Sequence, residues 1–140
     1  MITGVNHVTL AVTDLARSVA FWRDVAGLRL VADWARDGMA HGAYLEGGAL
    51  WLCLMRHDGP LPRRRDYTHI ALTCAPEEFD TLAARLRAHA PEWQENRSEG
   101  ASVYFLDPDG HRMELHCGTL QSRLRTWAEA PPPGLRLHPE

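Results

Sequence analysis

An internal repeat constrains the fold of this chain more than any other feature. The segment 6–12 (Asn-His-Val-Thr-Leu-Ala-Val) resembles the segment 68–74 (Thr-His-Ile-Ala-Leu-Thr-Cys). Both alternate apolar and polar side chains, which is the period of a β-strand. Each segment leads into a helical pattern, over residues 15–26 in the first half and 77–89 in the second. The sequence therefore predicts two related modules built from the same elements.

Further strands complete each module. The turn signal Gly47-Gly48 predicts a hairpin in the first half, and the sequence Asp-Pro-Asp-Gly at 107–110 predicts one in the second. The expected strands are 28–33, 42–46 and 49–55 in the first half, and 102–106 and 111–117 in the second. Both halves thus have the pattern β-α-β-β, with an extra strand in the first, and the predicted class is α+β.

The predicted organisation is a single domain spanning residues 1–140. Module 1 covers about 1–60 and module 2 about 66–118, separated by a linker rich in proline and arginine. The region 119–140 holds a helix over 119–129 and then a tail with three consecutive prolines. We expect this tail to be extended and poorly ordered, because proline excludes regular helix.

Composition limits the possible partners. The net charge of −3 argues against nucleic acid or an anionic membrane. The polar start of the chain predicts no signal peptide, and no apolar run approaches the ~20 residues of a membrane span, so we expect a cytoplasmic protein. The three cysteines, Cys53, Cys74 and Cys117, form no CxxC pair, and buried reduced thiols are favoured over a redox or metal role.

Two histidines and one glutamate form a candidate metal site. Strand alternation places His7 and Thr9 on the face opposite the apolar residues, and the repeat gives His69 the equivalent position. Glu114 adds a carboxylate from the second hairpin, whereas counting from the turn glycines gives Leu52 at the corresponding place in the first half. Two imidazoles and a carboxylate suit a divalent metal. Three ligands leave positions open for a substrate, which indicates a catalytic metal. A lone strand histidine is more often a hydrogen-bonded or surface residue than a ligand. Its recurrence in both halves strengthens the case for ligation, and the residues alone leave both interpretations open.

Several segments resemble the FosA fosfomycin-resistance thiol transferases of the vicinal oxygen chelate (glyoxalase-like) superfamily. The resemblance runs from residue 1 to about 125 and is carried by 3–12, 42–46, 50–54, 66–69, 96–100 and 104–112. It implies paired βαβββ modules in a homodimer with exchanged halves. The metal, usually Mn(II), would be held by His7 of one subunit and by His69 and Glu114 of the other.

The resemblance also implies the activity and further site residues. Family members add the thiol of glutathione to the epoxide of fosfomycin. The potassium loop of the family matches Asn96, Ser98, Glu99, Gly100 and Ser102. Substrate contacts fall on Thr9, Trp51, Ser98, Tyr104 and Arg123. The Thr9 hydroxyl would act in catalysis by hydrogen bonding the epoxide oxygen, and Arg123, Ser98 and Tyr104 would donate to the phosphonate.

Two departures from the family keep alternatives open. Gln94 stands where the FosA pattern carries a substrate-binding lysine, and His41 stands where related epoxide hydrolases of the FosX type carry a glutamate base. The alternatives are an epoxide hydrolase, a transferase of another thiol, a drug-binding protein without catalysis, and an Fe(II) dioxygenase. A solvated loop histidine is the favoured interpretation of His41.

Overall fold

The computed structural model describes residues 1–97 and 99–138 and contains two four-stranded sheets. The first module consists of β1 (Val8–Val12), α1 (Leu15–Ala20), the π-helical turn η1 (Phe21–Val25), β2 (Arg29–Arg36), β3 (Met39–Gly47) and β4 (Leu50–Arg56). The second consists of β5 (Ile70–Thr73), the 3-10 turn η2 (Pro76–Glu78), α2 (Phe79–His89), β6 (Glu92–Gln94), β7 (Ala101–Leu106) and β8 (Arg112–Cys117), and α3 (Leu120–Glu129) follows. The predicted α+β class and the paired modules are confirmed.

The two sheets have the same topology. Their strand orders are β1-β4-β3-β2 and β5-β8-β7-β6. In each sheet the first strand pairs in parallel with the last strand of its module, and the other pairs are antiparallel. Each module is therefore a βαβββ unit, and the repeat in the sequence corresponds to a repeat in structure.

The strand register corrects the predicted position in module 1 that corresponds to Glu114. Thr9 pairs with Cys53, and Ala71, its counterpart in the second module, pairs with Glu114. The position equivalent to Glu114 is therefore Cys53, and the prediction of Leu52 was wrong by one residue. The count from the glycines failed because the β3–β4 turn has two residues, 48 and 49, whereas the β7–β8 loop spans 107–111. Gly47 accordingly ends β3 and lies outside the turn.

Two other elements differ from the sequence prediction. The first helix was expected to be regular over 15–26, but after Ala20 it continues as a π-helical turn, in which the Ala26 N–H donates to the carbonyl of Phe21. The helix ends as predicted at Gly27, whose φ is +83°. Strand β6 was not predicted, because its three residues are too few to show a period.

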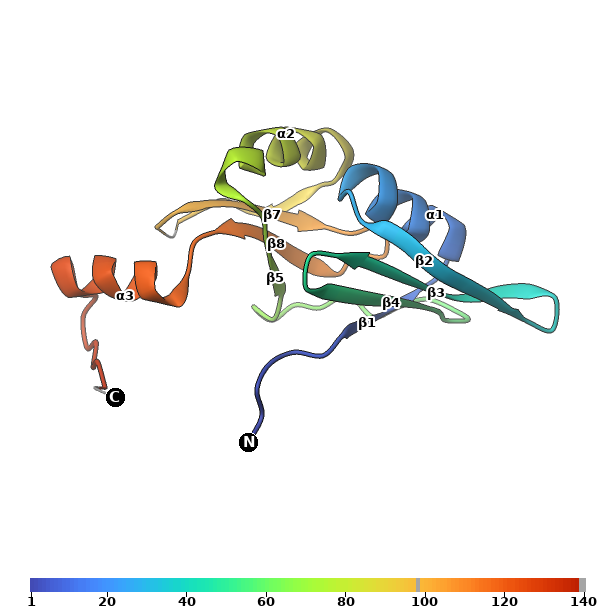
Figure 1. Cartoon of the computed structure of the whole chain (residues 1–140), viewed down its shortest axis with the longest axis horizontal. Coiled ribbons are helices and arrows are strands. Elements are labelled where there is room, and N and C mark those ends of the chain that lie inside the picture. The colour runs from blue at the N-terminus through green and yellow to red at the C-terminus, as the bar shows by residue number, and fades with distance from the viewer. Residues whose placement is uncertain (98, 139–140) are drawn as a thin grey trace.

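Both helices cover one side of the sheets, and their side chains form one core with the inner faces. In Figure 1, α1 and α2 lie on the same side of the two sheets. Phe21 and Trp22 at the end of the first helix contact Phe105 of β7, with ring centroids 6.2 Å and 6.4 Å apart. The two modules therefore share a hydrophobic core.

In the part of the chain that the structure describes, no helix covers the opposite faces of the sheets. Thr9 of β1 is exposed there, Trp51 of β4 keeps 38% of its surface accessible, and Tyr67 before β5 keeps 60%. Helix α3 also stands apart in Figure 1, and none of its residues is buried. It was predicted over residues 119–129, and it begins at Leu120 with Thr119 as its N-cap in a capping box with Ser122. No helix in the described part of the chain is long and apolar enough to cross a bilayer.

A buried carboxylate in the β7–β8 loop forms hydrogen bonds that link module 2 to module 1. Asp109 Oδ1 accepts hydrogen bonds from the Thr13 N–H, the Thr13 hydroxyl and Arg17 Nη2, at 2.9, 2.6 and 3.0 Å. Its Oδ2 accepts from the Ser18 hydroxyl at 2.8 Å. Burial acts to raise the pKa of Asp109, but the hydrogen bonds from Thr13 and Ser18 and the charge of Arg17 outweigh burial, so its pKa lies below the ordinary value.

We expect Asp109→Asn to lower the free energy of unfolding by about 1.5–3 kcal/mol at pH 7, the range for hydrogen bonds to a charged group. Because the folded-state pKa is lowered, the stabilisation is present above the unfolded-state pKa, near 3.8, and is lost as the pH falls through the folded-state value. Urea unfolding of wild type and variant at pH 7 and pH 3 measures this, and the difference should shrink at pH 3. Asp24→Asn, which removes only an exposed pair with Arg23, is the control. An equal loss of unfolding free energy in Asp109→Asn and Asp24→Asn would show that the contacts of Asp109 with module 1 do not stabilise the fold.

Candidate metal centre and substrate pocket

The structure brings two of the three predicted metal ligands together. His69 immediately precedes β5, and Glu114 lies in β8, which pairs with β5 in parallel. His69 Nε2 is 2.9 Å from Glu114 Oε2. Two ligands at right angles on an ion with bonds of about 2.1 Å lie roughly 3 Å apart, so this separation fits a shared divalent metal.

The hydrogen bond at the other ring nitrogen of His69 supports the same conclusion. His69 Nδ1 is 2.9 Å from the Tyr67 carbonyl, which is only an acceptor, so Nδ1 carries a proton. In the neutral ring Nε2 then has a free lone pair, and it faces a carboxylate oxygen that also has only lone pairs. A cation or an additional proton must lie between two such acceptors. The ring is oriented in the way typical of metal-ligating histidines.

Neighbouring side chains hold Glu114 in place. Only 6% of Glu114 is exposed, and its Oε1 accepts a hydrogen bond from the Ser102 hydroxyl at 2.7 Å. His116 Nδ1 lies 2.8 Å from the Ser102 oxygen and 3.5 Å from Glu114 Oε1. His116 was not among the predicted site residues, although its position two residues beyond Glu114 puts it on the same face of β8.

Hydrogen bonds of Asp66 also hold the turn that precedes His69. The Asp66 carboxylate accepts from the Thr68 N–H at 2.9 Å and pairs with Arg64. The hydrogen bonds from Arg64 and Thr68 hold the pKa of Asp66 well below its usual range, so the charged carboxylate keeps these contacts to a lower pH than an ordinary aspartate would. The turn thereby sets where the His69 ring enters the site.

The third predicted ligand lies on the other sheet. His7 precedes β1 and is exposed, its ring packs against Trp51 with centroids 4.7 Å apart, and its Nδ1 is 2.7 Å from Asn6 Oδ1. Thr9 is exposed two residues further on. Within residues 1–97 and 99–138 of a single chain, no three histidine, cysteine or acidic side chains are placed so that they could hold one metal ion together. His7 therefore does not complete the His69–Glu114 pair within one chain.

Aromatic rings and polar donors surround the His69–Glu114 pair. Trp93 and Tyr104 lie 5.6 Å and 6.0 Å from the His69 ring, between centroids, and Tyr104 is 3% exposed. The Gln94 amide donates to the Tyr67 hydroxyl at 3.3 Å. A hollow of about 430 Å³ is lined by Tyr67, Gln94, Arg97, Glu99, Tyr104, Arg123, Thr126, Trp127, Ala130 and Pro132. Three residues that were predicted to bind substrate lie in this lining: Gln94, Tyr104 and Arg123.

The predicted potassium loop lies beside this hollow. Asn96 Nδ2 donates to the Gly100 carbonyl at 3.0 Å, and Arg123 Nε lies 2.9 Å from Glu99 Oε1. Gly100 has a φ of +79°, and a Cβ there would lie 3.0 Å from the Cys117 carbonyl oxygen, so the turn requires glycine. Ser102 points to Glu114, as described above. Ser98, predicted for both the loop and the substrate site, lies outside the described residues.

The segment around His41 has a distinct geometry. Trp34 pairs with Gly42 and Ala35 with Ala40, so His41 is the extra residue of a β-bulge in β3. The Trp34 ring covers Gly42, where a Cβ would lie 2.1 Å from the indole. The Trp34, Tyr44 and Trp51 rings then continue in edge contact towards His7. His41 is half-buried within β3, whereas a solvated loop histidine was the favoured interpretation, and that interpretation was wrong.

Known proteins share this sequence and fold. A family model described as the glyoxalase/bleomycin resistance protein/dioxygenase superfamily matches residues 4–115. The chain is 48% identical to the glutathione transferase FosA of Serratia marcescens over 96% of its length and 95% of that protein. It is 34% identical to the metallothiol transferase FosB of Staphylococcus epidermidis, over 94% of this chain and 96% of the relative.

A solved structure supports the same assignment. It is a mutant of the fosfomycin resistance protein FosX from Listeria monocytogenes, in complex with Mn(II) and 1S,2S-dihydroxypropylphosphonic acid. It is 33% identical, covers 89% of this chain and 99% of its own, and superposes with a TM-score of 0.75. The chain therefore belongs to the glyoxalase/bleomycin resistance protein/dioxygenase superfamily and, within it, to the Fos group of fosfomycin resistance proteins.

Proposed function

We propose that this protein is a metal-dependent transferase that adds the thiol of glutathione to the epoxide of fosfomycin. The observation that carries the proposal is the His69–Glu114 pair, in which Nε2 and Oε2 are 2.9 Å apart. Tyr67 and Tyr104, whose rings contact His69, line a hollow that also holds Gln94 and Arg123. The 48% identity to a glutathione transferase over nearly the whole chain supports the choice of thiol.

The donor set fits one divalent metal, with Mn(II) the ion found in the similar FosX structure. His69 and Glu114 would hold it from one subunit and His7 from another, which leaves positions for substrate oxygens. When bound, a divalent metal supplies Lewis-acid stabilisation of the negative charge that develops on the epoxide oxygen. The Ser102 hydroxyl keeps the Glu114 carboxylate turned towards the site, and the Tyr67 carbonyl keeps His69 Nε2 free to ligate.

Thr9 and the hollow would act on the two ends of fosfomycin. The thiol loses its proton to solvent, its sulfur forms a bond to one epoxide carbon, and the C–O bond at that carbon breaks. The oxygen stays on the neighbouring carbon and takes up a proton from solvent to become a hydroxyl, and the Thr9 hydroxyl donates a hydrogen bond to it as its negative charge develops. Arg123, Ser98 and Tyr104 bind the phosphonate, with Gln94 as a neutral donor and Trp51 as an apolar wall. Holding both reactants in place removes much of the entropic cost of the bimolecular step.

We also propose a potassium ion at the loop formed by Asn96, Ser98, Glu99, Gly100 and Ser102. The Glu99 carboxylate would supply a charged oxygen ligand beside Arg123. A fixed monovalent cation there adds positive charge next to the phosphonate in a chain that has no lysine.

The proposed active form is a homodimer in which each site is shared between two chains. His7 is exposed on one open sheet face, and the His69–Glu114 pair lies on the other sheet. Trp51 and Tyr67 remain exposed on these faces, and α3 has no buried residue. A second copy that joined module 1 of one chain to module 2 of the other would cover this apolar surface and complete the ligand set.

Hydration of the epoxide is the second candidate, because His41 sits on a β-bulge, a feature that often re-aims side chains at functional sites. The deciding experiment is turnover of fosfomycin by the Mn(II)- and potassium-loaded protein, with and without glutathione, followed by phosphorus NMR. Thiol adduct formed only with glutathione supports the transferase. A diol formed at a comparable rate without thiol would establish the hydrolase, and His41→Ala would then be the first variant to test. No consumption of fosfomycin under either condition would refute both.

A substitution at Gln94 tests the proposed phosphonate site. A hydrogen bond to a charged partner is worth about 1.5–3 kcal/mol against roughly 1 kcal/mol for a neutral one, and a lysine there would also add charge. We expect Gln94→Lys to raise kcat/KM for fosfomycin several-fold to about tenfold without changing metal content. Steady-state kinetics and metal analysis measure the two effects.

Gln94→Met is the matched control, because it keeps the length of the side chain but removes the donor. Its kcat/KM should fall below that of wild type. An unchanged or lower kcat/KM in folded Gln94→Lys would mean that Gln94 does not face the phosphonate, or that the pocket is shaped for another substrate.

A further inference from the structure

Cys74 and Cys117 lie at equivalent ends of two neighbouring strands. The last register pair between β5 and β8 is Thr73 with His116, so the next residues on the two strands are these cysteines. Neighbouring strands lie about 4.8 Å apart. A disulfide requires Cα atoms roughly 4.4–6.8 Å apart, so the backbone spacing permits one.

Both side chains are on the same side of the sheet. Cys74 continues the alternation of Ile70 and Leu72, Cys117 continues that of Met113 and Leu115, and both thiols pack against the core cluster. Each is free and partly exposed, whereas Cys53 is 5% exposed. The expectation of buried thiols therefore holds for Cys53 but not for this pair.

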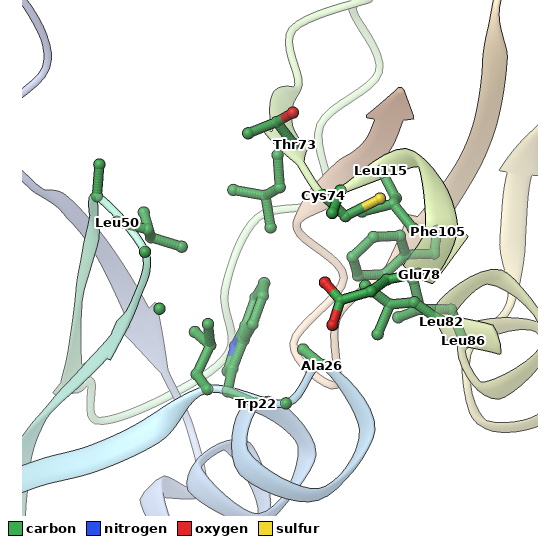
Figure 2. A pocket seen from close by; sticks show the side chains of 17 residues that line it. Trp22, Ala26, Leu50, Thr73, Cys74, Glu78, Leu82, Leu86, Phe105 and Leu115 are labelled. Carbon is green, nitrogen blue, oxygen red and sulfur yellow. The ribbon is translucent and has the colours of Figure 1, made fainter. Parts of the chain in front are cut away.

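Cys74 is open to a cavity between the two modules. The cavity has a volume of about 450 Å³, and its lining includes Cys74, Trp22, Leu50, Glu78 and Leu115. In Figure 2 the Cys74 side chain lies beside Leu115, and the Glu78 carboxylate points into the space between Cys74 and Ala26. A small molecule entering the cavity therefore meets the Cys74 thiol beside a negative charge, which favours a cationic reagent.

The surroundings of Cys74 favour the protonated thiol, which reacts slowly with disulfides. Burial raises the pKa of the Cys74 thiol, and Cys117, Glu78 and Glu77 raise it further. Because the thiolate is the nucleophile, exchange at Cys74 is slow at neutral pH and faster in mild alkali.

We propose that Cys74 and Cys117 form a redox-active dithiol that small disulfides oxidise to an intrachain disulfide. The Cys74 thiolate attacks one sulfur of the small disulfide, which gives a mixed disulfide and releases one thiol. The Cys117 thiolate then attacks the Cys74 sulfur and releases the second thiol. The protein loses two electrons and two protons, and the small disulfide is reduced to two thiols. The new bond joins the C-terminal ends of β5 and β8 on the face that packs against the core, at the opposite end of β5 from His69. This inference does not depend on the proposed catalytic activity.

The test is oxidation of the full-length protein with cystamine, a small cationic disulfide, at mildly alkaline pH. After denaturation and alkylation with N-ethylmaleimide, we expect three modified cysteines in reduced protein and one in oxidised protein. Peptide mapping should find Cys74 linked to Cys117, and dithiothreitol should reverse the change. Oxidation should also raise Tm by several degrees, because the bond restricts the unfolded chain.

Three cysteine variants serve as controls. Cys53→Ser should still form the link, whereas Cys117→Ser and Cys74→Ser should not, and Cys117→Ser should stop at a stable mixed disulfide on Cys74. Retention of three alkylated cysteines by oxidised wild type would overturn the proposal. So would a link through Cys53, separate cystamine adducts on Cys74 and Cys117, or a crosslink between chains. Mapping of the wild-type protein decides the question even if a serine variant does not fold.

Discussion

Glu114→Gln is expected to abolish turnover and to lower metal affinity sharply. The amide is nearly isosteric with the carboxylate, so the fold and the contact with Ser102 change little, but the negative charge that faces His69 Nε2 is lost. Replacing even an outer hydrogen-bond partner of a ligand typically costs 10–100-fold in affinity or activity. Removing a charged ligand has a larger effect, and we expect turnover to fall at least about a thousandfold, or roughly 4 kcal/mol in transition-state stabilisation.

Metal content after dialysis and the rate of adduct formation are the two measurements. Glu92→Gln is the matched control, because Glu92 lies on β6 in the same module and forms only an exposed pair with Arg87. It should retain metal and activity. Full activity and stoichiometric metal in folded Glu114→Gln would remove the basis of the proposed site.

Strand alternation explains why part of this site was predictable from the sequence. The period of two places His7 with Thr9 and puts Glu114 on one face of its strand. The repeat relates His7 to His69. None of these patterns gives the register between strands, and the contact of His69 with Glu114 depends on the pairing of β5 with β8. The role of Ser102 likewise depends on its position opposite His116 in the β7–β8 ladder.

Local deviations from regular geometry were the features that the sequence did not predict. Strand β6 is too short to show alternation, and its Trp93 is held by a hydrogen bond from Nε1 to the Met113 carbonyl, a long-range contact. The π-helical turn after Ala20 and the bulge at His41 each insert a residue into an otherwise regular element. Such insertions depend on tertiary packing and not on local propensity, so no local sequence signal marks them.

The largest gain of activity is expected from mixing two inactive variants, His7→Ala and Glu114→Ala. If each site takes His7 from one chain and His69 with Glu114 from the other, a mixed dimer has one site with both defects and one site with none. Random exchange makes about half of the dimers mixed, so roughly a quarter of wild-type activity should return. Turnover after mixing measures this, with exchange followed by native mass spectrometry of one tagged variant.

The matched control mixes His69→Ala with Glu114→Ala. Both residues lie in module 2 and contact each other within one chain, so every site of such a mixed dimer lacks one ligand. This pair should show no recovery, which separates a shared site from a general stabilisation by mixing. Absence of recovery in the His7→Ala and Glu114→Ala mixture despite complete exchange would show that each chain builds its own site. Module 1 would then have to approach module 2 of the same chain, with a rearrangement of the linker between β4 and β5 that brings His7 to the His69–Glu114 pair.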